Sequence, residues 1–201
     1  MDFVSVIIDA TSEVASSAKI GSASKIWGRS QIRESVVIGD NCIVGRNVYV
    51  GSGVQIGDNC KIQNNALIYE PAKLASGVFI GPGVILTNDQ YPRAVNDDES
   101  IKSVSDWIPV GVSIETGASV GAGAICVAPV KIGSWAMVAA GAVVTQNVPN
   151  FALVAGVPAR QIGWVGKSGY KLKESGDTFI CPKTGQEYLL VDGELQEDSG
   201  K

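Results

Sequence analysis

The residues best suited to chemistry gather in one polar stretch, residues 88–107, which reads NDQYPRAVNDDESIKSVSDW. Asn88 offers an amide oxygen, and Asp89 offers a carboxylate that can act as a weak base or as a second hydrogen-bond acceptor. The guanidinium fork of Arg93 suits a carboxylate or a diphosphate. Simpler roles stay open for each, because a loop-starting Asn can cap a turn and loop charges can stay solvated or form a salt bridge. The chain has no histidine, so imidazole chemistry is excluded.

A short hydrophobic repeat surrounds this stretch and must position it. Aliphatic residues recur at every sixth position from Ile8 to Leu86, and the position four residues later is usually small or β-branched. The register stops after Thr87, and we expect it to resume at Ile108 and to continue to about Val148. A unit this short cannot bury a core alone and must stack on its neighbours. The pattern therefore predicts a solenoid of short strands.

The same repeat predicts the organisation of the chain. Three units would make one triangular coil of about 18 residues, with a short parallel strand on each side. We therefore expect an all-β chain with a β-helix domain over residues 1–148 and an excursion loop at about 88–107. Residues 149–201 would form a C-terminal extension. A long excursion from a rigid scaffold is a common place for function.

The C-terminal extension lacks the repeat and is polar from Lys167 onward. Within it, Thr178–Cys181 and Glu187–Val191 flank the turn-forming sequence PKTGQ, which predicts a small hairpin. Residues 196–201 are predicted to be a disordered tail.

The composition argues against a nucleic-acid-binding, secreted or membrane protein. The net charge is −4 and no basic patch stands out, which argues against a nucleic-acid partner. The first ten residues lack the basic flank and apolar run of a signal peptide. No stretch approaches the roughly 20 apolar residues that span a bilayer. We therefore expect a cytoplasmic protein with no membrane partner.

The four cysteines fit a reduced, metal-free protein. Cys42 and Cys60 occupy equivalent inward positions and should stack on consecutive coils, and Cys126 occupies an aliphatic position. Cys181 has no CxxC partner, so we expect no zinc site.

Consecutive units of the form [LIV]-[GAED]-x-x-[STAVC]-x resemble the hexapeptide repeats of acyltransferases, which implies a left-handed parallel β-helix. Longer segments resemble bacterial N-acetyltransferases of 3-amino nucleotide sugars, most of all those acting on UDP-2-acetamido-3-amino-2,3-dideoxyglucuronate. These segments are KIQNNALIYE (61–70), GVFIGPGVILTNDQYPR (77–93), GAGAICVAPVKIG (121–133), AGAVVTQNVPNFALVAGVPARQIGW (140–164) and CPKTGQEYLL (181–190).

This resemblance implies a homotrimer with active sites between neighbouring subunits. Acetyl-CoA would be the cosubstrate, no metal would be needed, and a nucleotide-linked amino sugar would be the acceptor for surface polysaccharide synthesis. The acceptor could be a UDP-linked uronate or a dTDP-linked 3,6-dideoxyhexose. A trimer would also cover outward apolar residues such as Val37, Ile43 and Ile85.

The resemblance also assigns roles to individual residues. Asn88 matches the asparagine that holds the acceptor amine, and Asp89 lies beside it as a second catalytic candidate. The candidate acceptor-binding residues are Asn64, Asn65, Tyr69, Glu70, Tyr91 and Arg93. The candidate coenzyme A-binding residues are Gly121, Ala122, Gly123, Ala140, Gly141 and Arg160. Stacked asparagines and small residues at coil corners have a purely structural explanation as well.

The missing histidine favours one kind of acyl transfer. A hydroxyl acceptor has a pKa close to that of water, far above neutrality, and needs a base, whereas an amine beside electron-withdrawing groups should have a pKa of roughly 8. A site without histidine therefore favours N-acetylation, and the resemblance implies that the departing thiolate takes the proton. Two alternatives remain, a non-catalytic β-helix scaffold and a sugar O-acetyltransferase that uses Asp89 as its base.

Overall fold

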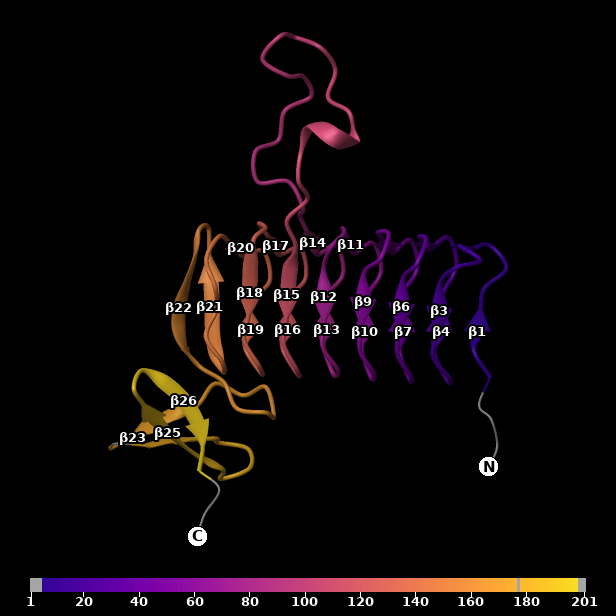
Figure 1. The fold of residues 1–201 in the computed structure, drawn as a ribbon. Helices are drawn as coiled ribbons and strands as arrows, with labels where there is room; N and C mark the ends of the chain where they lie inside the picture. Colours follow the sequence, from indigo (N-terminus) through magenta and orange to yellow (C-terminus); the bar gives the residue numbers. More distant parts are fainter. Residues whose placement is uncertain (1–4, 177, 199–201) are drawn as a thin grey trace.

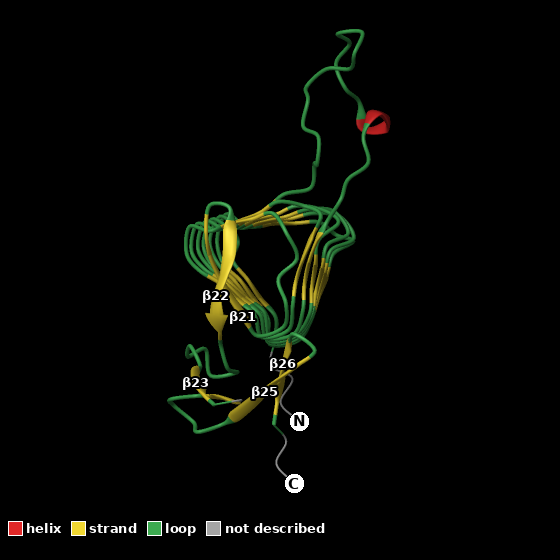
Figure 2. Ribbon diagram, turned by 90° about the vertical axis from the view of Figure 1, so that its left-hand side faces the viewer, coloured by secondary structure: helices red, strands yellow, loops and turns green. Residues whose placement is uncertain are grey.

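The computed structural model describes residues 5–176 and 178–198, and it shows an all-β chain with one short 3-10 helix. Most of the chain winds into a parallel β-helix, a prism whose three faces are each one sheet. Figure 2 shows these faces around a triangular cross-section. Figure 1 shows a loop that projects from one edge of the prism and a small separate sheet near its C-terminal end.

The prism faces are named A, B and C. Face A contains, in spatial order, β1 (Ile7–Ile8), β4 (Lys25–Ile26), β7 (Ile43–Val44), β10 (Lys61–Ile62), β13 (Phe79–Ile80), β16 (Ser119–Val120), β19 (Met137–Val138), β21 (Ala152–Gly156) and β22 (Ala159–Trp164). Face B contains β2 (Glu13–Val14), β5 (Gln31–Ile32), β8 (Tyr49–Val50), β11 (Leu67–Ile68), β14 (Ile85–Leu86), β17 (Ile125–Cys126) and β20 (Val143–Val144). Face C contains β3 (Lys19–Ile20), β6 (Val37–Ile38), β9 (Gln55–Ile56), β12 (Lys73–Leu74), β15 (Val112–Ile114) and β18 (Val130–Ile132).

The six-residue pattern produces this prism because each unit supplies two inward side chains. The second residue of most strands is aliphatic and buried, as Ile62 and Ile80 are, and so is the small residue that precedes the next strand, such as Ala66. Strands on consecutive coils pair in parallel, so that Ile62 lies opposite Val44 and Ile80. The result is one continuous core along the prism axis. This agrees with the predicted solenoid, including its extension back to Ile8 and Val14.

Tight corners join the faces, and their geometry explains the recurring asparagine and glycine residues. The second corner residue often has a positive φ, near 56° at Asn41 and 59° at Asn59, a region that Asn and Gly adopt at least cost. At the edge between faces C and A, Asp40 accepts the Ser22 N–H at 2.7 Å and Asp58 accepts the Asp40 N–H at 2.8 Å. Such ladders satisfy backbone donors that the turns leave unpaired.

The cysteines lie where the repeat places them. Cys42 and Cys60 are buried on consecutive coils, and the Cys60 N–H donates to the Cys42 sulfur at 3.4 Å. Cys126 is buried in the core, and Cys181 is buried in the C-terminal sheet.

The excursion loop is longer than the sequence predicted. Face B ends at Leu86 and face C resumes at Val112, so the loop includes residues 87–111 rather than 88–107. Ile108 does not resume the repeat, because it is 85% exposed on the loop. Its aliphatic character matched the register, but the chain returns to the prism only at Val112. The loop holds the 3-10 helix η1 (Val104–Asp106) and an antiparallel bridge between Val95 and Ile101.

The first part of the expected C-terminal extension continues face A of the prism, because β21 pairs in parallel with β19. The rest forms a four-stranded antiparallel sheet of β23 (Lys173–Ser175), β24 (Thr178–Ile180), β25 (Glu187–Val191) and β26 (Glu194–Glu197). The expected hairpin corresponds to β24 and β25. The prediction of disorder from residue 196 was wrong for Gln196 and Glu197, which pair with β25; residues 199–201 lie outside the described part. The sheet packs on the prism through Phe151 and Tyr188, whose ring centroids are 5.4 Å apart.

Two glycines with the same φ of 70° test how the prism corners are packed, Gly53 and Gly117. A Cβ on Gly117 would lie 2.5 Å from the Trp135 ring, whereas a Cβ on Gly53 would meet nothing within 4 Å. Gly53→Ala should lower the free energy of unfolding by about 1–2 kcal/mol through left-handed strain alone. Gly117→Ala should lower it by about 1–3 kcal/mol more, because the indole must move. Urea denaturation measures both, and equal losses would contradict the contact with Trp135.

Candidate active site

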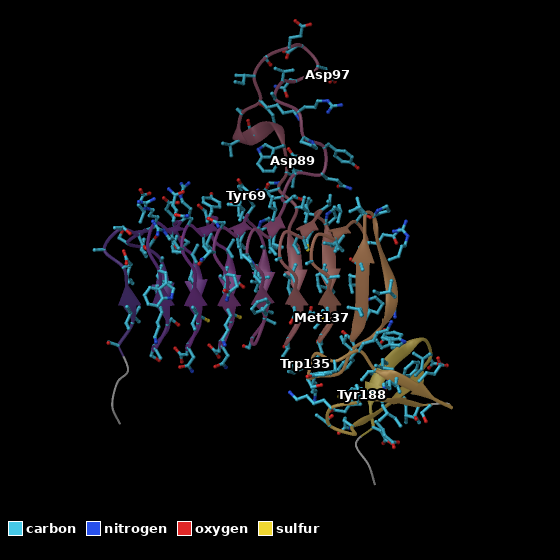
Figure 3. The ribbon with its side chains drawn as sticks, turned by 180° about the vertical axis from the view of Figure 1, so that it is seen from behind. Tyr69, Asp89, Asp97, Trp135, Met137 and Tyr188 are labelled. Carbon is cyan, nitrogen blue, oxygen red and sulfur yellow. The ribbon has the colours of Figure 1, made fainter. Side chains whose placement is uncertain are left out.

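The base of the excursion loop brings together candidate residues that are far apart in the sequence. Strands β11 and β14 pair in register, with Leu67 opposite Ile85 and Ile68 opposite Leu86. The Tyr69–Glu70 corner therefore lies one coil from Thr87–Asn88, at the edge between faces B and C. Figure 3 shows Tyr69 at this edge, with Asp89 just beyond it at the foot of the loop.

The neck of the loop is fixed by hydrogen bonds on both sides. The Val110 N–H donates to the Asn88 carbonyl at 3.0 Å, and Thr87 Oγ1 accepts the Ala128 N–H at 2.9 Å. The side-chain amide of Asn88 has no hydrogen-bond partner among the described residues, and the residue is half-buried. Asn88 therefore has a rigid backbone and an amide free to bind a ligand.

The other candidates on the loop are Asp89, which is half-buried like Asn88, and Tyr91 and Arg93, which are exposed. Asp89 accepts the Tyr91 N–H at 2.8 Å, which makes a local turn and occupies one carboxylate oxygen. Tyr91 is 75% exposed, and Arg93 donates only to the neighbouring Pro92 carbonyl at 3.0 Å. Asp89 and Tyr91 line a hollow of about 490 Å³ together with Trp107.

Glu70 is the most unusual side chain at this edge. Its Oε2 atom is buried and has no hydrogen-bond partner among the described residues. The carboxylate lies against Gly51, where a Cβ would overlap it. Other corner acids, such as Asp58, instead accept a backbone N–H from the neighbouring coil. A buried, unpaired acceptor is costly, so Glu70 differs from the other corner acids in leaving one oxygen unsatisfied at this edge.

Two tyrosines pack beside this carboxylate. The rings of Tyr49 and Tyr69 have centroids 5.1 Å apart and are tilted by 47°. Burial raises the pKa of the Tyr49 phenol, the charge of Glu70 raises it further, and Arg33 opposes both effects. Sequence reasoning missed Tyr49; the signal available was an aromatic residue at an outward position of the repeat.

The candidate coenzyme A residues occupy a different edge, between faces A and B. Gly121–Gly123 and Ala140–Gly141 form equivalent corners on consecutive coils, where the Gly141 N–H donates to the Ala122 carbonyl at 2.9 Å. A Cβ on Gly121 would lie 2.5 Å from the Ala140 nitrogen, so the tight corner itself demands glycine there. Cβ atoms on Gly123 and Gly141 would meet nothing within 4 Å, so the space outside these two corners is unoccupied by the chain. Arg160 is exposed on β22.

Asn64 and Asn65 also lie on the edge between faces A and B, and both take part in corner ladders. Asn64 Oδ1 accepts the Arg46 N–H at 2.8 Å, and Asn65 Oδ1 accepts from Asn47 Nδ2 at 3.1 Å. This is the structural role that the sequence left open for them. Neither residue lies on the edge that carries Tyr69, Glu70 and Asn88.

A single chain therefore divides the candidate residues between two edges of the prism. One edge holds Tyr69, Glu70 and the loop, and the other holds the two asparagines, the small corner residues and Arg160. No cluster of three or more metal-ligating side chains occurs within residues 5–176 and 178–198. Among the described residues, no helix has the length and apolar character needed to cross a bilayer.

Comparison with known proteins agrees with this architecture. Residues 35–70 and 110–146 match the hexapeptide repeat of succinyl-transferase, and residues 17–52 and 53–88 match the bacterial transferase hexapeptide. Together these matches include more than half of the chain. Over these residues the chain therefore carries the hexapeptide repeat of bacterial transferases.

Particular relatives make the likeness more specific. The chain is 42% identical over 80 residues to the dTDP-3-amino-3,6-dideoxy-alpha-D-galactopyranose 3-N-acetyltransferase of Aneurinibacillus thermoaerophilus, a match that includes 40% of this chain. It spans 41% of that relative's length.

Two solved structures share the fold at lower identity. A hexapeptide transferase family protein from Anaplasma phagocytophilum has a TM-score of 0.53 at 20% identity, covering 82% of this chain and 81% of that one. The acetyltransferase domain of PglB from Neisseria gonorrhoeae FA1090, in complex with acetyl coenzyme A, has a TM-score of 0.51 at 21% identity, covering 79% and 58%. At this identity the likeness shows the fold alone.

The electrostatic effect of Glu70 on Tyr49 can be tested by titration. Glu70→Gln removes one of the charges that raise the pKa of Tyr49, while burial, the larger cause, stays. The Tyr49 midpoint should therefore move down toward the ordinary tyrosine value without passing below it. Ultraviolet difference titration against a Tyr49→Phe background measures this midpoint, and an unchanged midpoint would show that the carboxylate lies elsewhere.

Proposed function

We propose that this chain is an acetyl-CoA-dependent N-acetyltransferase that acts on the 3-amino group of a nucleotide-linked sugar. The observation that carries the proposal is the free Asn88 amide, held at the loop neck beside Tyr69 and the unpaired Glu70 carboxylate. An amide oxygen and a carboxylate are acceptors suited to an amine. The name of the Aneurinibacillus relative, a 3-N-acetyltransferase of a dTDP-3-amino sugar, supports this acceptor class.

The chemistry needs little from the protein beyond positioning. Asn88 Oδ1 accepts an N–H of the amine and turns the nitrogen lone pair toward the thioester. The nitrogen forms a bond to the acetyl carbon, the carbon–sulfur bond breaks, and the amine proton passes to the departing thiolate. The products are an amide and a free thiol. Because about a tenth of an amine with a pKa near 8 is neutral at pH 7, no imidazole is required, and proximity supplies most of the rate.

We further propose a homotrimer in which the loop edge of one copy faces the small-residue edge of the next. Acetyl-CoA would lie along the open corners of Gly121–Gly123 and Ala140–Gly141, with Arg160 near its phosphates. The separation of candidates onto two edges supports this arrangement, since one chain alone does not assemble them. Exposed Val37, at 42%, fits a surface that is covered on assembly.

The acceptor could carry UDP with a uronate or dTDP with a 3,6-dideoxyhexose, and Tyr91 and Arg93 of the loop would approach its charged groups. We place the reaction in the cytoplasm and its product in surface polysaccharide synthesis, as the family resemblance implies. One oxygen of Asp89 accepts the Tyr91 N–H, and we propose that its other oxygen serves as a second hydrogen-bond acceptor for the amine.

A thiol-release assay with acetyl-CoA tests the proposed reaction. Release is expected with 3-amino nucleotide sugars and not with their 3-hydroxy counterparts. At saturating acetyl-CoA the rate should rise with pH to about 8 and then level off, as the amine loses its proton. Transfer to the hydroxyl acceptors alone would favour an O-acetyltransferase. A folded protein that releases thiol with neither class would favour a scaffold.

The role of Asn88 can be separated from general damage to the loop. Asn88→Ala should lower kcat about a hundredfold, because the amine loses its orienting acceptor, while the melting temperature stays close to that of the wild type. Asn96→Ala is the matched control, since Asn96 lies on the same loop and its side chain bonds only within it. Equal kinetics for the two variants would remove Asn88 from the mechanism.

A further inference from the structure

The strand that carries Arg160 is weakly specified by its own sequence. β22 is the last strand in the spatial order of face A, so one of its edges has no strand partner in the described part of the chain. None of its six residues is buried, and its pairing with β21 shifts register between Leu153 and Val154. A strand without a buried face has a weakly specified register, and a slip of one residue turns every side chain to the opposite face. Another part of the molecule must therefore fix Arg160 in place.

The C-terminal end of β22 is held where the chain leaves the prism. The Val165 N–H donates to the Phe151 carbonyl at 2.8 Å, and the Leu172 N–H donates to the Trp164 carbonyl at 2.9 Å. The Trp164 side chain packs against both the prism core and the core of the C-terminal sheet. On the sheet it meets Phe179 of β24, with ring centroids 6.5 Å apart. Trp164 is therefore the residue through which the C-terminal sheet holds β22.

The prism corners beneath this sheet carry two aromatic residues in an unusual conformation. Trp135 and Phe151 have φ values of 58° and 59°, whereas earlier coils have alanine, asparagine or glycine at this corner position, such as Asn59. Bulky side chains adopt this region rarely and with strain. Both rings meet the sheet, because Phe151 packs on Tyr188 with centroids 5.4 Å apart and Lys167 Nζ lies 5.6 Å from the Trp135 ring centroid. Figure 3 shows Trp135 and Tyr188 at this junction.

We infer that the C-terminal sheet positions Arg160 for coenzyme A binding. By holding Trp164, the sheet sets the register of β22, and that register keeps Arg160 at the edge between faces A and B. The inference rests on the proposed function, in which Arg160 lies near the phosphates of acetyl-CoA. The Ala139 N–H donates to the Val154 carbonyl at 2.8 Å, so β21 stacks on the coil of the Ala140–Gly141 corner. The sheet therefore acts on coenzyme A binding from the opposite end of the strand.

Calorimetric titration with coenzyme A tests this, with far-UV circular dichroism to show that each variant is folded. Phe179→Ala removes the ring that Trp164 meets and should weaken coenzyme A binding by up to about tenfold, toward the affinity of Arg160→Gln. In the thiol-release assay the KM for acetyl-CoA should rise, while kcat and the KM for a 3-amino nucleotide sugar stay as they were. Leu190→Ala is the matched control, since Leu190 is 46% exposed on the same sheet, and it should change none of these values.

A double-mutant cycle separates positioning from general damage. If Phe179 acts through Arg160, Phe179→Ala should weaken coenzyme A binding much less in the Arg160→Gln background than in the wild type. Equal losses in the two backgrounds would overturn the inference, because a loosened prism weakens binding whether or not Arg160 is present. If Phe179→Ala does not fold, Phe179→Leu keeps an apolar side chain without the ring and allows the same cycle.

The outcomes distinguish this inference from the proposed function. If the wild type and Phe179→Ala bind coenzyme A equally well, or if Leu190→Ala loses as much affinity as Phe179→Ala, the inference fails and the proposed function stands. If the wild type does not bind coenzyme A, both fail. If binding depends on Phe179 and Arg160 as expected but no acetyl group passes to a 3-amino nucleotide sugar, the positioning role stands and the proposed acceptor is wrong.

Discussion

The hydrogen-bonded stacking of each coil on the next is the constraint on which the rest of the structure depends. A six-residue unit buries too little to be stable by itself, so each strand of two or three residues relies on the strands of neighbouring coils. That requirement keeps the inward positions aliphatic or small and keeps the corners tight. It also explains why the long interruption seen within the described residues leaves the prism at a corner, between β14 and β15, where no strand is broken.

Stacking also gives the prism its chemistry-bearing surfaces. Residues 18 positions apart lie on top of one another, so each edge becomes a column of side chains with a rigid backbone. At many corners these side chains accept hydrogen bonds from backbone N–H groups, as Asp58 and Asn64 do. Where a side chain is not used in this way, as at Asn88, it is available for a ligand. The candidate site therefore includes side chains that take no part in these hydrogen bonds between neighbouring coils.

The sequence predicted some of these features and not others. The faces, the core and the stacked cysteines followed from the six-residue register, because burial depends only on which side chains point inward. The register failed at Ile108, where an aliphatic residue continued the period but lay on the loop. It also failed at Gln196 and Glu197, whose polar sequence suggested disorder although pairing with β25 orders them. Composition alone does not report the strand partner that satisfies a polar backbone.

By itself, the sequence determined an all-β solenoid of stacked hexapeptides, its loop and its lack of imidazole, since each depends on residue type and spacing along the chain. Only the tertiary structure decided which polar side chains remain unpaired. Asn64 accepts the Arg46 N–H, the Oε2 atom of Glu70 is buried beside Gly51 without a donor, and the candidates divide between two edges. These outcomes depend on how far each side chain reaches across neighbouring coils, and a one-dimensional pattern does not contain that distance.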